Sequence, residues 1–303
     1  MSTISQNISQ IHNDIQEAST INAFPEKITL VAVSKSQNFN KIIEAFDVGV
    51  LNFGENYLQE ALDKKKQLEK FPIQWHFLGP IQSNKCKLIA ENFSWVHSVD
   101  RIKVMKLLND NRPSNLPPLN ICIQINTSGE ETKSGIPIKD AKAHLLELIQ
   151  ALKKLPKLKL RGIMSIPSNT KDTKQVIDEF KAMHILYSEL KNEIATIDTL
   201  SMGMSSDFKL AIEYGSNLVR IGTAIFGARA VKTHGGQLWL ACIALACEWM
   251  GVILRRPRCI PSSLEDVPGC IVVAHHDVAK DAIEFCSCVY QFKLPACAFM
   301  CAM

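Results

Sequence analysis

Short apolar runs rich in β-branched residues alternate with amphipathic segments along most of the chain. The first segment is an amphipathic helix, with Ile4, Ile8, Ile11 and Ile15 at helical spacing. Eight later segments have the composition of buried strands, and they cover residues 28–33, 50–54, 74–79, 94–99, 120–126, 158–166, 199–204 and 218–226. Between them, apolar residues recur every three or four positions, which indicates helices.

This alternation predicts an α/β protein with a parallel sheet, because each pair of parallel neighbours needs a crossover and each crossover here is a predicted helix. Eight such units favour closure into a (β/α)8 barrel, the TIM barrel. A doubly wound open sheet is the structural alternative. It is disfavoured because no Gly-x-Gly-x-x-Gly turn follows the first predicted strand.

Composition indicates a globular protein without a nucleic-acid footprint. The 303 residues are 47% hydrophobic, enough for a sizeable core, and the net charge is only +4 without any long block of one sign. The run Lys64, Lys65, Lys66 is interpreted as a solvated helix face. The first helix lacks the basic start and continuous apolar centre of a signal peptide, so we expect a cytoplasmic protein.

The last 73 residues differ from the rest and hold eight of the ten cysteines. Four of them, with two histidines, could be assembled into a metal site, but the spacing fits no common zinc pattern, so no metal site is predicted; these residues are Cys286, Cys288, Cys297, Cys301, His275 and His276. The apolar residues 238–254 reach the short limit for a membrane span, but the central Glu248 makes insertion costly. We therefore predict a barrel domain over residues 1–230 and, over 231–303, an atypical Cys-rich tail of unknown role and poor order.

Lys35 directly follows the first predicted strand. In a β/α barrel, functional groups gather where strands end. A lysine partly removed from water there loses some of its preference for the charged form, and the neutral amine is the form that condenses with an aldehyde. The alternative is a solvated lysine just past a strand.

The last two predicted strands carry residues suited to phosphate. Residues 201–205 (SMGMS) end the seventh strand, and residues 220–223 (RIGT) lie on the eighth. Hydroxyls, glycine amides and a helix N-terminus at these two places commonly bind phosphate in barrels. Ser205 and Ser206 could also cap a helix that starts near Asp207.

Five motifs closely resemble the pyridoxal phosphate homeostasis protein family, in the order the family has them, and the match runs from the first helix to about Arg229. The motifs are residues 31–35 (VAVSK), 53–57 (FGENY), 76–85 (HFLGPIQSNK), 201–205 (SMGMS) and 219–227 (VRIGTAIFG).

The resemblance implies a barrel similar to the N-terminal domain of alanine racemase, with pyridoxal 5′-phosphate held as a Schiff base on Lys35. It implies phosphate contacts from Ser201, Gly222 and Thr223, with Arg220 facing the pyridine nitrogen. A permanently charged guanidinium discourages protonation of that nitrogen, so the ring becomes a weaker electron sink. The predicted cofactor-binding residues are Lys35, Asn56, Ser201, Met204, Ser205, Arg220, Gly222 and Thr223.

Other residues would lie beside this site. Asn56 and residues 82–84 would line its mouth, though Asn56 could equally cap a helix that opens at Tyr57. Lys133 matches a lysine in the family's loop after the fifth strand. Our hypothesis is that it briefly captures the aldehyde as the cofactor leaves, and the alternative is a solvated loop lysine beside two glutamates. His76 is predicted to be a satisfied core residue outside the site.

Three classes of function compete: a carrier that serves intracellular vitamin B6 homeostasis without substantial catalysis, an amino-acid racemase, and a pure interaction module. Racemisation needs a second acid or base opposite Lys35. In racemases with this barrel it is a tyrosine of a separate β domain, whereas this chain has only Tyr290 after residue 230. The carrier is therefore favoured, with apo forms of enzymes that use this cofactor as candidate acceptors, and we expect a monomer.

Overall fold

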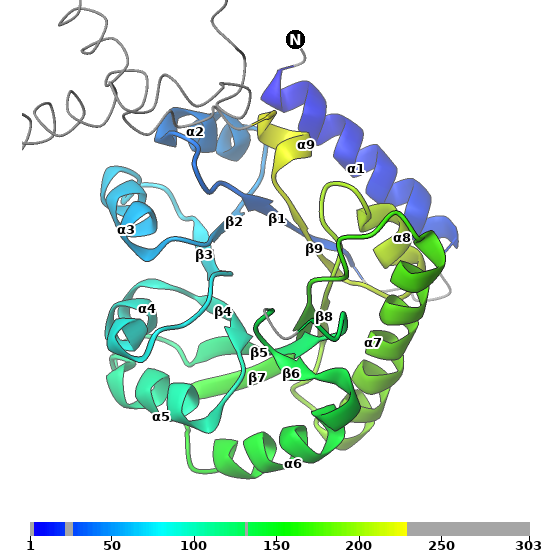
Figure 1. Cartoon of the computed structure of the whole chain (residues 1–303). Helices are drawn as coiled ribbons and strands as arrows, with labels where there is room; N and C mark the ends of the chain where they lie inside the picture. The colour runs from blue at the N-terminus through cyan, green and yellow to red at the C-terminus, as the bar shows by residue number, and fades with distance from the viewer. Residues whose placement is uncertain (1–2, 22–26, 131–132, 229–303) are drawn as a thin grey trace, which may run out of the picture. The chain divides into compact units, whose positions relative to one another are not determined.

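The computed structural model describes residues 3–21, 27–130 and 133–228, and eight of its strands close into a ring (Figure 1). The ring strands are β1 (Thr29–Val33), β2 (Asn52–Glu55), β3 (Gln74–Phe77), β4 (Trp95–Val99), β5 (Leu119–Asn126), β7 (Leu158–Ser165), β8 (Thr199–Ser201) and β9 (Leu218–Ile221). Every neighbouring pair is parallel, and β9 pairs with β1 to complete the barrel. The predicted barrel is confirmed, and the open sheet is excluded.

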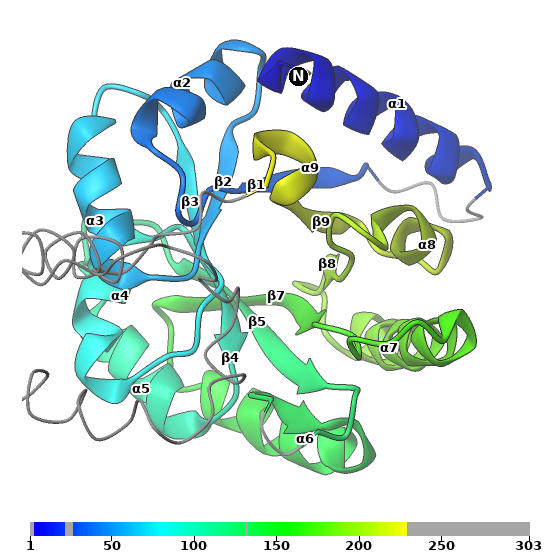
Figure 2. The same cartoon turned by 45° about the horizontal axis from the view of Figure 1, so that its top comes forward.

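Helices connect the strands and cover the outside of the ring (Figure 2). They are α2 (Phe39–Asp47), α3 (Leu58–Gln67), α4 (Cys86–Asn92), α5 (Ile102–Asn111), α6 (Ala141–Leu152), α7 (Thr173–Glu193), α8 (Phe208–Glu213) and α9 (Thr223–Phe226), with 3-10 turns η1 (Ser83–Lys85) and η2 (Ile138–Asp140). The first helix, α1 (Ile4–Ile21), buries its four predicted isoleucines and packs along α2, α8 and α9. Its predicted amphipathic character is confirmed.

The first six predicted strands differ from the observed ones by one or two residues at an end, and the last two are too long. The seventh, 199–204, ends at residue 201 in the structure, and the last four residues of the eighth, 218–226, form α9. A short additional strand, β6 (Ile136–Pro137), pairs with β5 outside the ring and was not predicted. Two residues, one of them proline, give too weak a signal to be recognised.

The sheet separates two cores. A large apolar core lies between strands and helices, whereas the inside of the barrel holds a small cluster of Trp95, Cys122 and Met164 together with polar side chains. Alternate residues of a strand point to opposite faces, so each strand contributes to both cores. The polar interior is the part that leads to the site.

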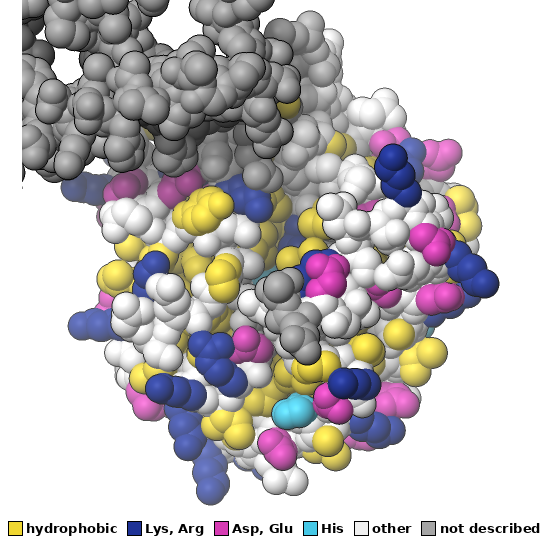
Figure 3. Space-filling view, in the orientation of Figure 1, with side chains coloured by type: hydrophobic (Ala, Val, Ile, Leu, Met, Phe, Trp, Pro, Cys, Tyr) yellow, Lys and Arg dark blue, Asp and Glu magenta, His cyan; other side chains and the backbone are white. Residues whose placement is uncertain are grey.

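Charges of both signs are interspersed on the face shown in Figure 3. Within the described residues, no helix is both long and apolar enough to cross a membrane. The predicted tail, residues 231–303, lies outside the described residues.

Candidate functional site

Lys35 lies in a turn at the carboxyl end of β1 and is half-buried. The residue before it, Ser34, is fully buried and donates its hydroxyl to Glu55 Oε1 at 2.6 Å on the outer side of the sheet. The amide of Gln37 donates to the Ser34 carbonyl at 3.0 Å and closes the turn. Lys35 therefore lies at the barrel rim, where the sequence predicted it.

Ser205 and the start of α9 form a cluster of converging amides. Ser205 Oγ accepts hydrogen bonds from the backbone amides of Gly222, at 3.2 Å, and Ala224, at 3.3 Å. A Cβ added to Gly222 would lie 3.1 Å from the carbonyl of Val33, so glycine lets this turn approach the end of β1 closely. Two amides aimed at one oxygen are the arrangement that holds a phosphate oxygen. Thr223, the first residue of α9, is exposed beside them.

Neither of the helix caps considered as alternatives occurs. Helix α8 begins at Phe208 without a side-chain cap, so the alternative role of Ser205 and Ser206 as its caps is wrong. Asp207 instead accepts the Met204 amide at 2.5 Å.

Asn56 does not cap α3 either. That helix begins at Leu58, with Tyr57 in the capping position and no side-chain cap, so the alternative role of Asn56 is wrong. A Cβ added to Gly79 would collide with the Asn56 carbonyl, which means that the chain segments after β2 and β3 are in close contact. In residues 82–84, Gln82 and Asn84 are exposed and Ser83 is half-buried.

A chain of hydrogen bonds crosses the inside of the barrel. Arg220 Nη1 lies 2.6 Å from Ser201 Oγ, and Ser201 Oγ lies 3.1 Å from His97 Nδ1. The other nitrogen, His97 Nε2, lies 2.9 Å from His76 Nδ1, and His76 Nε2 lies 3.1 Å from Asn52 Oδ1. We call these five residues the interior chain.

Burial and the two ends together fix the direction of the interior chain. Burial keeps both histidines neutral, so each has one donor and one acceptor nitrogen. Arg220 can only donate and the Asn52 carbonyl oxygen can only accept, so each intervening group accepts from the arginine side and donates toward the asparagine. Burial lowers the pKa of His76 to about 3, and burial, His76 and Arg220 together lower the pKa of His97 far below its ordinary value. His76 is confirmed as a satisfied core residue.

Ser201 and Arg220 are bound to each other rather than to the Ser205 cluster. Ser201 is fully buried, and both its hydroxyl proton and its oxygen are engaged in the interior chain. Arg220 also donates to the Ser165 carbonyl at 2.7 Å. Burial lowers the pKa of Arg220 to about 10, so the guanidinium stays charged at neutral pH. Ser165 Oγ is buried without a hydrogen-bond partner among the described residues.

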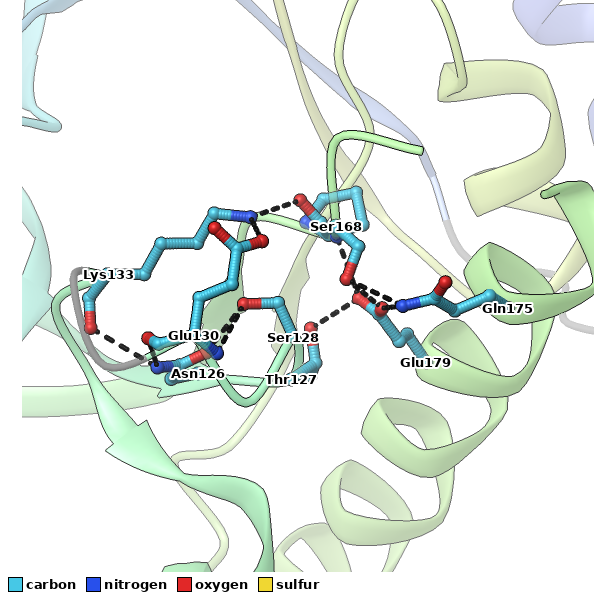
Figure 4. Close-up of polar contacts among 9 residues, drawn as sticks. Asn126, Thr127, Ser128, Glu130, Lys133, Ser168, Gln175 and Glu179 are labelled. Carbon is cyan, nitrogen blue, oxygen red and sulfur yellow. Dashed lines mark hydrogen bonds and ion pairs between the residues drawn. The ribbon is translucent and has the colours of Figure 1, made fainter. Parts of the chain in front are cut away.

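Lys133 connects two loops (Figure 4). Its amine lies 2.7 Å from Glu130 Oε1 on its own loop and 3.3 Å from the Pro167 carbonyl after β7. Because the side chain is 26% exposed and paired, Lys133 is neither fully solvated nor buried.

Glu179 joins the segments beside Lys133 and was not recognised from the sequence. This buried carboxylate on α7 accepts from Thr127 Oγ1 and the Ser168 amide, both at 2.9 Å, and from the hydroxyl of Ser168 (Figure 4). It connects α7 with the chain after β5 and after β7. No local sequence pattern predicts these hydrogen bonds, because the partners of Glu179 lie far from it in the sequence.

The three consecutive lysines on α3 differ in environment. Lys66 is exposed, but Lys64 is only 5% exposed, and burial lowers the pKa of the half-buried Lys65 to about 8. The expectation of one solvated face is therefore wrong. Helical spacing does indicate that Lys64 is buried, because it follows the buried Leu58 and Ala61 at three-residue steps.

Comparisons with known proteins agree on one group of relatives. The family model for the alanine racemase N-terminal domain matches residues 6–230. The pyridoxal phosphate homeostasis protein of Vibrio alginolyticus is 49% identical over 234 residues, which are 76% of this chain and 99% of the relative. The protein of that name from Escherichia coli K12 is 46% identical over 76% of this chain and 98% of its own.

Solved structures give the same result. PipY of Synechococcus elongatus PCC7942, solved with PLP bound, has a TM-score of 0.63 and 30% identity, and the match covers 74% of this chain and all of PipY. An alanine racemase from Clostridium difficile 630 has a TM-score of 0.57 at 14% identity, covering 75% of this chain and 57% of the racemase. That second similarity concerns the fold alone.

Proposed function

The chain belongs to the pyridoxal phosphate homeostasis protein family, and from that premise we propose that it binds pyridoxal 5′-phosphate as a Schiff base on Lys35. In this role it keeps a reactive aldehyde in check within intracellular vitamin B6 homeostasis. The observation that carries the proposal is a half-buried lysine at the rim of a barrel whose adjacent strand leads to two amides converging on one oxygen.

The residues at the rim fit a phosphorylated aldehyde. The amides of Gly222 and Ala224, with the hydroxyls of Ser205 and Thr223, are suited to hold the phosphate. Met204 and Asn56 are proposed to contact the bound molecule from neighbouring loops. When bound, the cofactor supplies an aldehyde carbon that condenses with the neutral lysine amine, with loss of one water.

Arg220 and Ser201 are proposed to act on the ring side. Hydrogen bonds to Ser201 and to the Ser165 carbonyl hold the guanidinium, which stays charged at neutral pH. A fixed positive charge there disfavours a protonated pyridine nitrogen and so weakens stabilisation of a carbanion. Ser201 thereby contributes through Arg220, which differs from the direct phosphate contact that the resemblance implied.

A carrier is favoured over a racemase. Among the residues proposed to hold the cofactor, only Lys35 and Arg220 have acidic or basic side chains, and Arg220 stays charged at neutral pH, whereas racemisation needs a second acid or base. Tyr290 lies outside the described residues. We propose a cytoplasmic monomer that donates cofactor to apo forms of enzymes that use it.

Borohydride reduction with peptide mapping tests the proposal. The purified protein should absorb in the visible range, lose that band on reduction, and carry the label on Lys35. Lys35→Ala should abolish both signals. Label on a different residue, or no label, would contradict the proposal, and robust inversion of single amino-acid enantiomers by the holo-protein would favour the racemase.

The proposed transfer role of Lys133 has its own test. Lys133→Ala should slow delivery of cofactor to an apo-enzyme while leaving the label on Lys35 unchanged, because only the exit step is affected. Lys139→Ala, an exposed lysine of the same region, is the control. Transfer at the unmodified rate in Lys133→Ala would remove the hypothesis.

A further inference from the structure

Three side chains from β2 and α3 converge on the turn that carries Lys35. Lys64 Nζ donates to the Ser34 carbonyl at 2.6 Å and to Oε1 of both Glu55 and Glu60 at 2.7 Å. An ammonium has three donors, so all three are used. Lys64 and Glu55 are buried, and the Glu60 side chain is 23% exposed.

The two carboxylates hold the residues on either side of Lys35. Glu55 Oε1 accepts the Ser34 hydroxyl at 2.6 Å, and Glu60 Oε1 accepts the Ser36 amide at 2.5 Å. Ser36 has a φ of 61°, the left-handed conformation that residues with a Cβ rarely adopt. Such a conformation persists when the surrounding structure holds it. We call Lys64, Glu55, Glu60, Ser34 and Ser36 the Lys64 network.

Stability alone does not explain a cluster of this kind. Charges that are buried lose their hydration, and well-packed apolar residues of similar volume are often as stable or more stable. The contacts of the Lys64 network go to the backbone immediately before and after one side chain. Their common consequence is a fixed direction for the bond from Cα to Cβ of Lys35.

We propose that Lys64, together with Glu55 and Glu60, is a positioning residue that orients the Lys35 amine toward the aldehyde carbon. This inference rests on the proposed function. In the condensation, the nitrogen of the neutral amine forms a double bond to the aldehyde carbon, the carbon–oxygen double bond breaks, and the oxygen leaves as water with the two hydrogens of the amine. The Lys64 network orients the Lys35 amine for this step and exchanges no proton with the amine or the aldehyde. A misplacement of about 1 Å can slow such a reaction by up to about 100-fold.

Two variants remove the positioning without leaving an unpaired buried charge. Lys64→Met combined with Glu55→Gln removes an ammonium and a carboxylate together, so the protein should still fold. Glu60→Ala removes the acceptor of the Ser36 amide at a partly exposed helix position where alanine is well tolerated. The matched controls are Lys66→Met and Asp63→Ala, both exposed on the same helix.

Two measurements separate orientation from binding. The first is the rate at which pyridoxal 5′-phosphate is trapped on Lys35 by cyanoborohydride. The second is the affinity for pyridoxine 5′-phosphate, which has the ring and phosphate but no aldehyde. Both positioning variants should be trapped at least about tenfold more slowly and bind pyridoxine 5′-phosphate like the unmodified protein, and both controls should match it in both measurements.

Trapping at the unmodified rate in both positioning variants would overturn the inference, as would an equal loss of trapping and of pyridoxine 5′-phosphate binding, which would indicate a structural role. If the double variant does not fold, the trapping rate and the pyridoxine 5′-phosphate affinity of Glu60→Ala alone test the inference. If Lys35 of the unmodified protein is labelled and the variants behave like it, only the positioning inference fails and the proposed function holds. If Lys35 is not labelled, both the proposed function and the inference fail.

Discussion

Two buried sets of polar residues, the interior chain and the Lys64 network, satisfy their hydrogen bonds inside the protein in opposite ways. The interior chain is linear, and its two histidines are neutral and pass one hydrogen bond in one direction. The Lys64 network is branched and centred on an ion pair. The interior chain holds the charged Arg220 beneath the site, and the Lys64 network holds the turn that carries Lys35. Two separate hydrogen-bond networks therefore stabilise the site.

The two groups respond to pH with opposite signs. Burial raises the pKa of Glu55, partly offset by Lys64, so ionising Glu55 costs folded-state stability as the pH rises through its folded pKa. The histidines have lowered pKa values, so their contribution is complete at high pH and is lost as the pH falls. Predictions that separate the two groups follow from this contrast.

The largest effect is expected for Lys64→Met alone. It leaves Glu55 as a buried carboxylate without its cation, and breaking a buried ion pair in this way costs about 3–5 kcal/mol of the free energy of unfolding. Urea unfolding measures it. Adding Glu55→Gln should restore most of the loss, and a double variant as unstable as the single one would show that the charge is not the cause.

His97→Leu should cost about 2 kcal/mol, because the Ser201 hydroxyl and His76 Nδ1 both lose their partner inside the barrel. The measurement is again urea unfolding. His12→Leu, at an exposed position of α1, is the control and should change stability by less than about 0.5 kcal/mol. If the two substitutions cost the same, the interior chain contributes nothing beyond ordinary packing.

The sequence reveals the strands but not these two groups. Local apolar runs identify all eight ring strands, and the end of the first one places Lys35 at the rim. The interior chain joins Ser201 to His97 across 104 residues, a pairing that exists only after the barrel closes. Lys64 was missed for a different reason, since a charged run suggests solvent even where helical spacing points inward.

Acid should weaken the interior chain measurably. An unfolded histidine takes up a proton below about pH 6.5, whereas folded His76 stays neutral down to about pH 3. At pH 5.5 this linkage costs about 1.4 kcal/mol per histidine relative to pH 7.5. His76→Gln should therefore lose about 1.4 kcal/mol less than the unmodified protein between the two pH values, and an equal loss would mean that His76 already binds a proton in the folded state.

The smallest effect is expected from removing the excess negative charge of the Lys64 network, in which two carboxylates surround one ammonium. The charge of Glu60 helps to raise the pKa of Glu55, after the larger effect of burial. Glu60→Gln leaves one acid opposite Lys64 and keeps an oxygen for the Ser36 amide, so stability at neutral pH should change by no more than about 0.5 kcal/mol. The pKa of Glu55, followed by carboxyl NMR, should fall, and the loss of stability as the pH rises through it should become smaller. A pKa that stays in place would show that burial alone sets it and that Glu60 acts in the network only through its hydrogen bond to Ser36.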